Sequence, residues 1–248
     1  MTSEIVAQAA FNNALWCDAV CSTHQGRGEF HQDLWINRFG VPRYYPDVVT
    51  LTGVNAASAQ TQAISALVGS MSRRDWAVKD SFQSLKLNDH GFTRLFDAEW
   101  IGATSEFPLV RTVSHKLQWR RVDSEPALQN WERCWAEEPT TRQSRIFMPR
   151  LLLEPDIHFV FAVEEGVLVG GGILNRGAGV VGISNVFASN VDPEMIWAGL
   201  TLSARSAFLG LPLAAYDHRK EQLEAAHRVG FATVGHLRIW HIAPTGQS

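Results

Sequence analysis

Hydrophobic positions are most regular in the second half of the chain. Apolar residues fill 180–187 almost without interruption, which predicts a buried strand. After a short polar segment, apolar residues recur at helical spacing over 195–208. Asp192 suits the N-cap of this helix, and Pro193 suits its first position. The pattern therefore predicts a strand, a loop and a helix in succession.

The same criteria predict elements on both sides of this stretch. In the second half we expect strands at 117–122, 159–163, 167–174, 213–216 and 233–242, and helices at 126–136, 147–153 and 221–228. In the first half we expect helices at 11–21 and 56–68, and strands at 34–39, 48–51, 76–82 and 95–101. Gly230 is expected to end the last helix in a left-handed conformation. This mixture predicts an α/β protein with a mixed sheet.

A polar segment at 103–114, which contains Pro108, lies between the two sets of elements. We interpret it as an ordered linker between two domains, 1–115 and 116–248. Each would be of ordinary size for a folded domain, and the chain is long enough to bury a sizeable core.

Composition and charge narrow the class of protein. Hydrophobic residues make up 46% of the 248 residues and charged residues 19%, which is typical of a globular chain. The formal net charge is −3 without a run of Lys and Arg, so we expect no nucleic-acid partner. No apolar stretch is long enough to span a membrane, and the first residues lack the pattern of a signal peptide. We therefore expect a cytoplasmic protein with no membrane partner.

The three cysteines do not suggest disulfides, because their number is low and odd. Cys17, Cys21 and His24 would share a helix face, with His31 nearby as a fourth metal ligand. The alternative is two cysteines packed inward and a histidine near the helix end. We favour this alternative and expect no metal, because none of the usual zinc-ligand spacings is present.

Two local sequences, together with the order of elements, indicate a family. The hairpin residues at 165–171 read Glu-Gly-Val-Leu-Val-Gly-Gly, and 226–231 read Ala-His-Arg-Val-Gly-Phe before the last strand. With the order strand, helix, helix, three-strand meander, helix, strand, helix, strand, the region 117–241 resembles the GNAT N-acyltransferase superfamily. The resemblance implies a GNAT-like fold, transfer of an acyl or acetyl group from acyl-CoA to a small-molecule amine, and acyl-CoA held along the central strand and its loop, at Val186, Phe187, Ala188, Ser189 and Asn190.

A short segment of the first half is similar in sequence to the end of the chain. Lys79-Asp80-Ser81-Phe82 is followed by Gly91-Phe92 and an apolar strand, just as Tyr216-Asp217-His218 is followed by Gly230-Phe231 and an apolar strand. One interpretation is a smaller, truncated GNAT-like copy packed against the second half. The alternative is chance similarity between two Gly-Phe turns, since two copies alone rarely prove a repeat.

The sequence departs from the GNAT pattern where the cofactor's pyrophosphate is expected. The family's Arg/Gln-x-x-Gly-x-Gly/Ala run falls on 192–197, which has no glycine and begins Asp192-Pro193-Glu194. Two carboxylates then lie where a polyanion would dock, and Asp192 is expected to cap the helix itself. Either CoA binds in another way, or it does not bind at this loop.

The position at which the family often carries a catalytic tyrosine is Ala226. Tyr216, Asp217 and His218 instead follow a strand at its carboxyl end, where open α/β sheets place chemistry. We regard them as candidate catalytic residues, and the alternative is a strand-end tyrosine before a polar helix entry. Ser184 and Asn185 interrupt the apolar central strand. They either line a substrate cleft or bond to neighbouring loops.

Two functions remain open at this point. One is an acyl-CoA-dependent N-acyltransferase acting on a small molecule, which we favour on the resemblance. The other is a GNAT-shaped protein without acyl-CoA chemistry, either a binding module or an enzyme of other chemistry in the same cleft. A homodimer is also open, because the tryptophans at 119, 131 and 135 suit either a core or a dimer interface.

Overall fold

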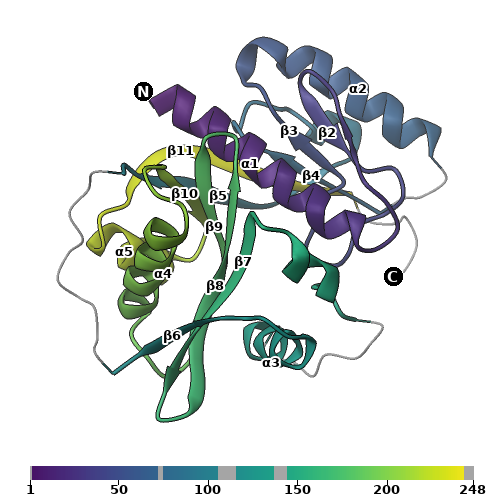
Figure 1. Ribbon diagram of the computed structural model, residues 1–248. Helices are drawn as coiled ribbons and strands as arrows, with labels where there is room; N and C mark the ends of the chain where they lie inside the picture. The colour runs from purple at the N-terminus through teal and green to yellow at the C-terminus, as the bar shows by residue number, and fades with distance from the viewer. Residues whose placement is uncertain (1, 72–74, 106–115, 137–143, 243–248) are drawn as a thin grey trace. The chain divides into compact units, whose positions relative to one another are not determined.

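The fold is described by a computed structural model, which covers residues 2–71, 75–105, 116–136 and 144–242 (Figure 1). The chain divides into two compact units. We call residues 1–99 with 235–248 the terminal unit, and residues 100–234 the central unit. The boundaries fall inside two long strands, β5 (Thr93–Ala103) and β11 (Ala232–Ile242). Most of the expected linker at 103–114 lies outside the described residues, as does the expected boundary at 115, and the division into 1–115 and 116–248 stays a prediction.

The terminal unit is a mixed sheet with helices. Its strands lie in the order β1-β2-β3-β4-β11, and only β3 and β4 are parallel neighbours. Helix α2 connects these two, as a parallel pair requires a crossover. The elements are α1 (Thr2–Ser22), β1 (Glu29–Phe30), β2 (Leu34–Ile36), β3 (Val48–Thr50), η1 (Val54–Ala56), α2 (Ala57–Ser70), β4 (Trp76–Asp80) and η2 (Asn88–His90).

The central unit is built on the same principle. Its strands lie in the order β10-β9-β8-β7-β6, in which β9 and β10 are parallel and the other pairs antiparallel. Helix α4 connects the parallel pair. The elements are β6 (Gln118–Arg121), α3 (Glu125–Ala136), η3 (Pro149–Leu153), β7 (Ile157–Glu164), β8 (Val167–Gly177), β9 (Val180–Ala188), α4 (Pro193–Ala207), β10 (Leu213–Asp217) and α5 (Lys220–Arg228). The expected α/β class with a mixed sheet is confirmed.

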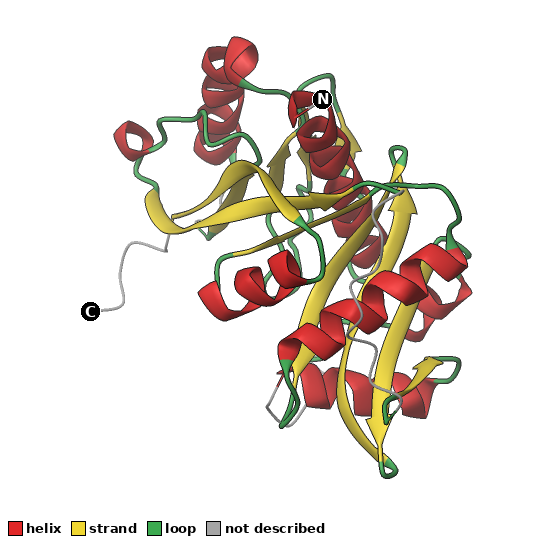
Figure 2. Cartoon of the chain, turned by 90° about the vertical axis from the view of Figure 1, so that its left-hand side faces the viewer, coloured by secondary structure: helices red, strands yellow, loops and turns green. Residues whose placement is uncertain are grey.

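Three consecutive glycines in β8 let helices approach both faces of this sheet (Figures 1 and 2). A Cβ added at Gly170 would lie 2.5 Å from Ile196 Cδ1 of α4, and one at Gly172 would lie 2.8 Å from Leu200 Cδ1 of the same helix. A Cβ at Gly171 would lie 2.9 Å from Trp131 Nε1 of α3. Because successive strand residues face opposite sides, α4 and α3 cover opposite faces. The glycines are therefore required by packing.

Trp131 is the centre of the core on the α3 side. Its ring is fully buried and lies 5.6 Å from that of Phe147 and 5.2 Å from those of Phe159 and Phe187. Its Nε1 donates to the Val160 carbonyl over 3.0 Å, so its one polar atom is satisfied. Trp135 stacks on it at 6.4 Å. Of the two placements left open for these tryptophans, the structure shows the core for Trp131.

Helix α1 begins much earlier than the expected residue 11. Its first half is rich in alanine, which favours helix without help from packing. From Ala9 onward, buried residues occur on most sides of the helix, so the apolar stripe that sequence patterns detect is weak. Three of the buried residues, Asn12, Asn13 and Asp18, are polar. Asp18 accepts from the Gly28 amide and Trp35 Nε1, and Asn13 accepts from Lys79 Nζ over 2.7 Å.

The two Gly-Phe turns share a backbone pattern as well as a sequence. Gly91 and Gly230 both have positive φ, 82° and 104°. In each turn the glycine amide bonds three residues back and the phenylalanine amide five residues back, at 3.0–3.2 Å. Both phenylalanines are buried, and a long strand follows each. The left-handed glycine expected at Gly230 is confirmed, whereas the repeat itself stays a prediction.

Within the part of the chain that the structure describes, no helix is both long and apolar enough to span a membrane.

Candidate active site

The parallel strands β9 and β10 separate part-way along their length. They pair at Leu213 with Val181, Ala214 with Gly182, and Ala215 with Ile183. Beyond Ile183, β9 continues to Ala188 without a further paired residue on β10. The last residues of β9 are therefore not paired with β10. They lie at the carboxyl end of the sheet, where α/β proteins place ligands.

A β-bulge lies at the start of this edge. The register of β8 and β9 shifts between Gly171, opposite Phe187, and Ile173, opposite Ser184. Asn185 lies in the bulge with a φ of 53°, a left-handed conformation that asparagine tolerates better than most residues. Its occurrence inside an apolar strand thus has a backbone explanation. Ser184, the neighbouring candidate, has a buried hydroxyl without a partner among the described residues.

Asp217 stabilises the turn that follows β10. Its Oδ1 accepts from the backbone amides of His218 and Arg219, both over 2.8 Å. The Arg219 guanidinium binds both carboxylate oxygens, through Nε over 3.0 Å and Nη2 over 2.7 Å. With its oxygens engaged in this way, Asp217 is better suited to positioning Arg219 than to accepting a proton from substrate.

The other two candidate catalytic residues differ in exposure. Tyr216 is half-buried, and its ring meets that of Trp100 edge-on at 5.3 Å. His218 is exposed, with Nδ1 3.9 Å from Asp217 Oδ1. Tyr216 follows Ala215, the last residue of β10 that pairs with β9, and so stands where the strands separate. The structure brings the candidates to one strand end, and their catalytic roles stay predictions.

The helix start expected to hold pyrophosphate is already occupied by the chain itself. Asp192 caps α4, as expected, with Oδ1 accepting from the Glu194 amide over 2.9 Å. Pro193 has no amide hydrogen, and the Met195 amide bonds the Asp192 carbonyl over 3.0 Å. These are the donors that an anion at a helix N-terminus would require. The first turn of α4 is therefore unsuited to a pyrophosphate.

The loop before this helix is equally engaged. Ser189 donates its amide to the Val169 carbonyl over 2.8 Å, and Asn190 makes the turn with a φ of 58°. Phe187 packs its side chain against Trp131. Of the five residues assigned to the cofactor, Val186 accepts a hydrogen bond from the β10 side through its carbonyl.

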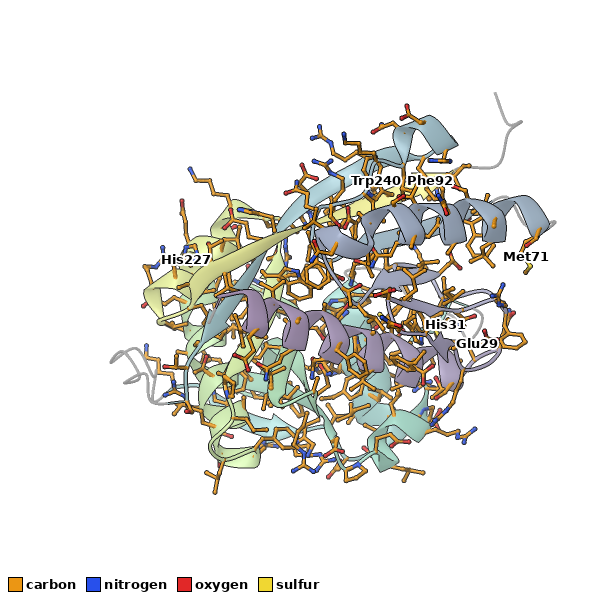
Figure 3. All side chains as sticks on the ribbon, turned by 90° about the horizontal axis from the view of Figure 1, so that it is seen from above. Glu29, His31, Met71, Phe92, His227 and Trp240 are labelled. Atoms are coloured by element: carbon orange, nitrogen blue, oxygen red, sulfur yellow. The ribbon has the colours of Figure 1, made fainter. Side chains whose placement is uncertain are left out.

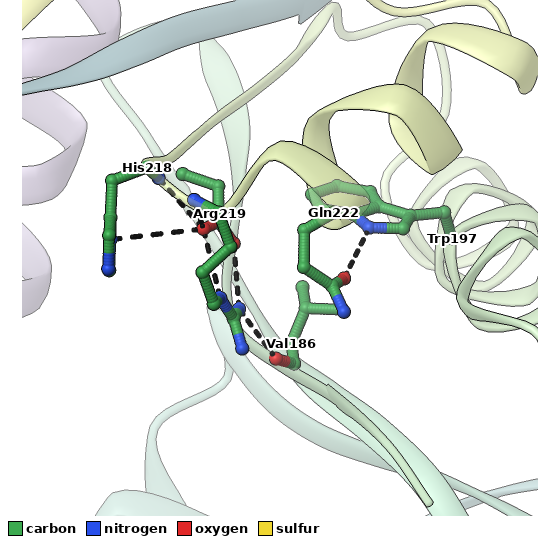
Figure 4. Close-up of polar contacts among 6 residues, drawn as sticks. Val186, Trp197, His218, Arg219 and Gln222 are labelled. Carbon is green, nitrogen blue, oxygen red and sulfur yellow. Dashed lines mark hydrogen bonds and ion pairs between the residues drawn. The ribbon is translucent and has the colours of Figure 1, made fainter. Parts of the chain in front are cut away.

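Two arginines of this region were not identified from the sequence. Arg219 Nη2 donates to the Val186 carbonyl over 3.3 Å (Figure 4). Arg228 binds Glu194 over 2.6 Å and so compensates one of the carboxylates at the start of α4. Arg219 could have been found from the sequence, because it lies two residues after the strand-end Asp217. The second is a contact between helices that spacing alone does not reveal.

The remaining histidine and cysteine candidates differ in burial. Ala226, at the family's tyrosine position, is fully buried, and His227 is exposed at the surface (Figure 3). Burial raises the pKa of the Cys17 thiol to about 11 and raises that of Cys21 further. Metal binding needs thiolates, so these environments oppose it. Among the described residues, no group of three or more His, Cys, Asp and Glu is placed to hold a metal ion.

No family model and no curated protein sequence matches the chain. Solved structures do match it. A GCN5-related N-acetyltransferase from Kribbella flavida has a TM-score of 0.64 at 14% identity, with 96% of this chain and 96% of that chain covered. The chain has the GNAT fold. A GCN5-related N-acetyltransferase from Sphaerobacter thermophilus has a TM-score of 0.53 at 13% identity, with coverage of 94% and 91%.

A functionally uncharacterised conserved protein from Staphylococcus epidermidis has a similar fold, with a TM-score of 0.59 at 11% identity and coverage of 86% and 92%. The likeness to these three structures extends well beyond 117–241, the region of the sequence resemblance. It includes most of the residues before 117, for which the sequence supplied only the echo of a Gly-Phe turn.

Proposed function

We propose that this GNAT-fold chain is an N-acyltransferase that moves an acyl group, such as acetyl, from acyl-CoA to a small-molecule amine. The observation that carries the proposal is the separation of β9 from β10 beyond Ile183 and Ala215, next to the bulge at Asn185. A strand edge without a neighbouring strand can pair with an extended ligand through backbone hydrogen bonds. The pantetheine arm of acyl-CoA is such a ligand, because it is extended and contains amide groups.

The two ends of the cofactor differ in how well they fit. The arm fits the edge of β9, where the carbonyl of Val186 faces the β10 side. The pyrophosphate does not fit the start of α4, whose first amides are used by Asp192. We therefore place the contribution to binding mainly on the arm, along Val186 to Asn190. When bound, acyl-CoA would supply the thioester whose acyl group is transferred.

The chain's own groups at this edge have distinct tasks in the proposal. In an extended strand the amide and carbonyl of one residue face the same neighbour, so the Val186 amide faces the β10 side with its carbonyl. It would donate to the oxygen on which negative charge develops. Tyr216 would donate the proton from its hydroxyl that the departing thiolate needs, and His218 would accept one from the attacking amine. Ser184 would contact the substrate.

One observation favours a second function. The capped and acidic start of α4 is what a GNAT-fold protein would have if it no longer used acyl-CoA, and acted as a binding module or as an enzyme of other chemistry. Arg219 also donates a hydrogen bond to the Val186 carbonyl, so a ligand along β9 would have to compete for this acceptor.

Calorimetric titration with acetyl-CoA, CoA and S-acetylpantetheine separates the two. If the arm provides most of the affinity, S-acetylpantetheine binds within about tenfold of acetyl-CoA. Release of free thiol from acetyl-CoA in the presence of a panel of primary amines would then identify the acceptor. The acyltransferase proposal fails if none of these ligands gives heat or thermal stabilisation at millimolar concentration.

A further inference from the structure

The unpaired end of β9 leads to the first turn of α4. Strand β9 ends at Ala188, and α4 begins at Pro193 after a short loop. In the proposed function an extended arm lies along Val186 to Asn190, so the group at the far end of the arm comes to the start of α4. In acyl-CoA this group is a nucleotide whose phosphates are negatively charged at neutral pH. The surroundings of this helix start therefore decide which pantetheine thioesters the site accepts.

The backbone at this place is already bonded within the chain. The Glu194 amide donates to Asp192 Oδ1 over 2.9 Å, and the Ser189 amide donates to the Val169 carbonyl over 2.8 Å. Pro193 has no amide hydrogen to donate. A phosphate that arrived here would have to break these bonds or remain in water, so the backbone gives it no favourable site.

The arginine and lysine side chains of α5 and of the turn before it already face carboxylates. The pairs are Arg219 with Asp217 at 2.7 Å, Lys220 with Glu224 at 3.6 Å, and Arg228 with Glu194 at 2.6 Å. These pairs are neutral in sum, and the exposed Asp192 adds one more carboxylate beside Glu194. The charge summed over these side chains is therefore negative, which disfavours a polyanion.

We infer that the acyl donor is a pantetheine thioester that lacks the nucleotide of CoA. This donor assignment rests on the proposed function and narrows it, because acyl-CoA has the required arm but its phosphates oppose binding. In the transfer the amine nitrogen forms a bond to the thioester carbon and the carbon–sulfur bond breaks. The sulfur leaves as a thiol with the proton that the amine loses. These reacting groups are the same with and without the nucleotide.

Three acetyl thioesters that share the arm separate its effect from that of the phosphates. S-acetylpantetheine has no phosphate, S-acetyl-4′-phosphopantetheine has one, and acetyl-CoA has several. Binding of each to the full chain would be measured by calorimetry at about 20 mM and about 500 mM NaCl. At the lower salt we expect S-acetylpantetheine to bind about fivefold more tightly than acetyl-CoA, because the carboxylates repel the phosphates. At the higher salt, screening should bring the two affinities within about twofold.

The singly phosphorylated thioester distinguishes the two sources of such an arm. A free pantetheine thioester has no phosphate, whereas an arm attached to a carrier protein is joined to it through one. If this probe binds as tightly as S-acetylpantetheine, a carrier-borne arm fits the site. If it binds as weakly as acetyl-CoA, the donor is a free thioester.

Two matched substitutions locate the repulsion. Glu194→Gln removes a carboxylate at the start of α4 and leaves Arg228 without that partner. Asp156→Asn does the same to Arg176 at the other end of the sheet, next to the pairing of Ile157 with Asn175. We expect only Glu194→Gln to strengthen acetyl-CoA binding, by about fivefold, and neither to change the binding of S-acetylpantetheine.

Equal or tighter binding of acetyl-CoA at the lower salt, or acetyl-CoA binding that weakens as salt rises, would overturn the donor assignment and leave the acyltransferase proposal standing. Equal effects of the two substitutions on acetyl-CoA binding would overturn the assignment as well. If none of the three thioesters binds, the proposed function fails, and the donor assignment fails with it.

Discussion

The guanidinium of Arg219 donates a hydrogen bond to the carbonyl of Val186 over 3.3 Å, at the point where β10 and β9 separate. The same guanidinium binds both oxygens of Asp217. Arg219 thus connects the end of one strand to the open edge of the other. The pairing of β9 with β10 ends before this point, so a side chain provides the hydrogen bond between them.

Replacing Arg219 with alanine is expected to lower the free energy of unfolding by about 1–2 kcal/mol. Asp217, whose side chain is 8% exposed, would lose a cation and two hydrogen bonds, whereas the 49% exposure of Arg219 keeps the loss moderate. Lys220→Ala is the matched control, because that side chain is 89% exposed, and it should change stability by less than about 0.5 kcal/mol. Urea unfolding of the three proteins provides the comparison. Equal effects of both substitutions would show that the bridge contributes nothing.

Asp192 caps α4, and its removal by Asp192→Ala should cost about 1 kcal/mol in urea unfolding. Asp192→Asn retains a capping oxygen and removes the charge, so its stability should stay near that of the wild type. If acyl-CoA binds as proposed, the same Asn variant should bind CoA more tightly than the wild type, because one carboxylate near the phosphates is gone. Unchanged CoA binding by Asp192→Asn would mean that the cofactor's phosphates lie elsewhere.

Gly171→Ala is expected to destabilise the chain by about 2 kcal/mol or more, because the new methyl group would meet the Val160 carbonyl and Trp131 Nε1. Gly69→Ala should instead stabilise by about 0.5–1 kcal/mol, since that glycine lies in α2 with no atom near its added Cβ. Thermal unfolding of the two variants checks the opposite signs. A harmless Gly171→Ala would show that α3 can withdraw from β8.

Tyr216→Phe tests the proposed proton donor once an amine substrate is known. Loss of the hydroxyl should lower kcat by about 10²–10⁴-fold, the usual contribution of a general acid. The KM for the thioester should change little, because the ring and its contact with Trp100 remain. An unchanged kcat in single-turnover measurements would remove Tyr216 from the chemistry.

Because the Cys17 thiol is buried, we expect the free energy of unfolding to fall at high pH. The pKa of this thiol is about 11 in the folded chain against an ordinary 9.0, chiefly because burial disfavours the thiolate. Between these values the unfolded chain binds fewer protons than the folded one, so the free energy of unfolding falls as pH rises from about 9 to about 11. The loss is on the order of 2–3 kcal/mol. Cys17→Ala should show a shallower decline over this range in urea unfolding, and an identical decline would assign the effect to other groups.

Most elements of the second half could be predicted from the sequence because their signals are local. The apolar run at 180–187, the cap at Asp192 and the glycine at Gly230 each act within a few residues, and all three appear in the structure. The helix predicted at 11–21 is shorter than α1 (Thr2–Ser22). Burial on several sides of α1 weakens the periodicity on which such predictions depend. Strand β1 was missed because it has only two residues.

For the candidate site, too, the sequence predicted only features that are local in the chain. The chain alone placed Tyr216, Asp217 and His218 at a strand end, since these residues are consecutive. It also indicated that the start of α4 is acidic. Only the tertiary structure shows that β9 and β10 separate beyond Ile183, that Arg219 bonds across the gap, and that Arg228 compensates Glu194. Local patterns determine where strands and helices begin, whereas pairing register and contacts between distant residues depend on how the whole chain packs.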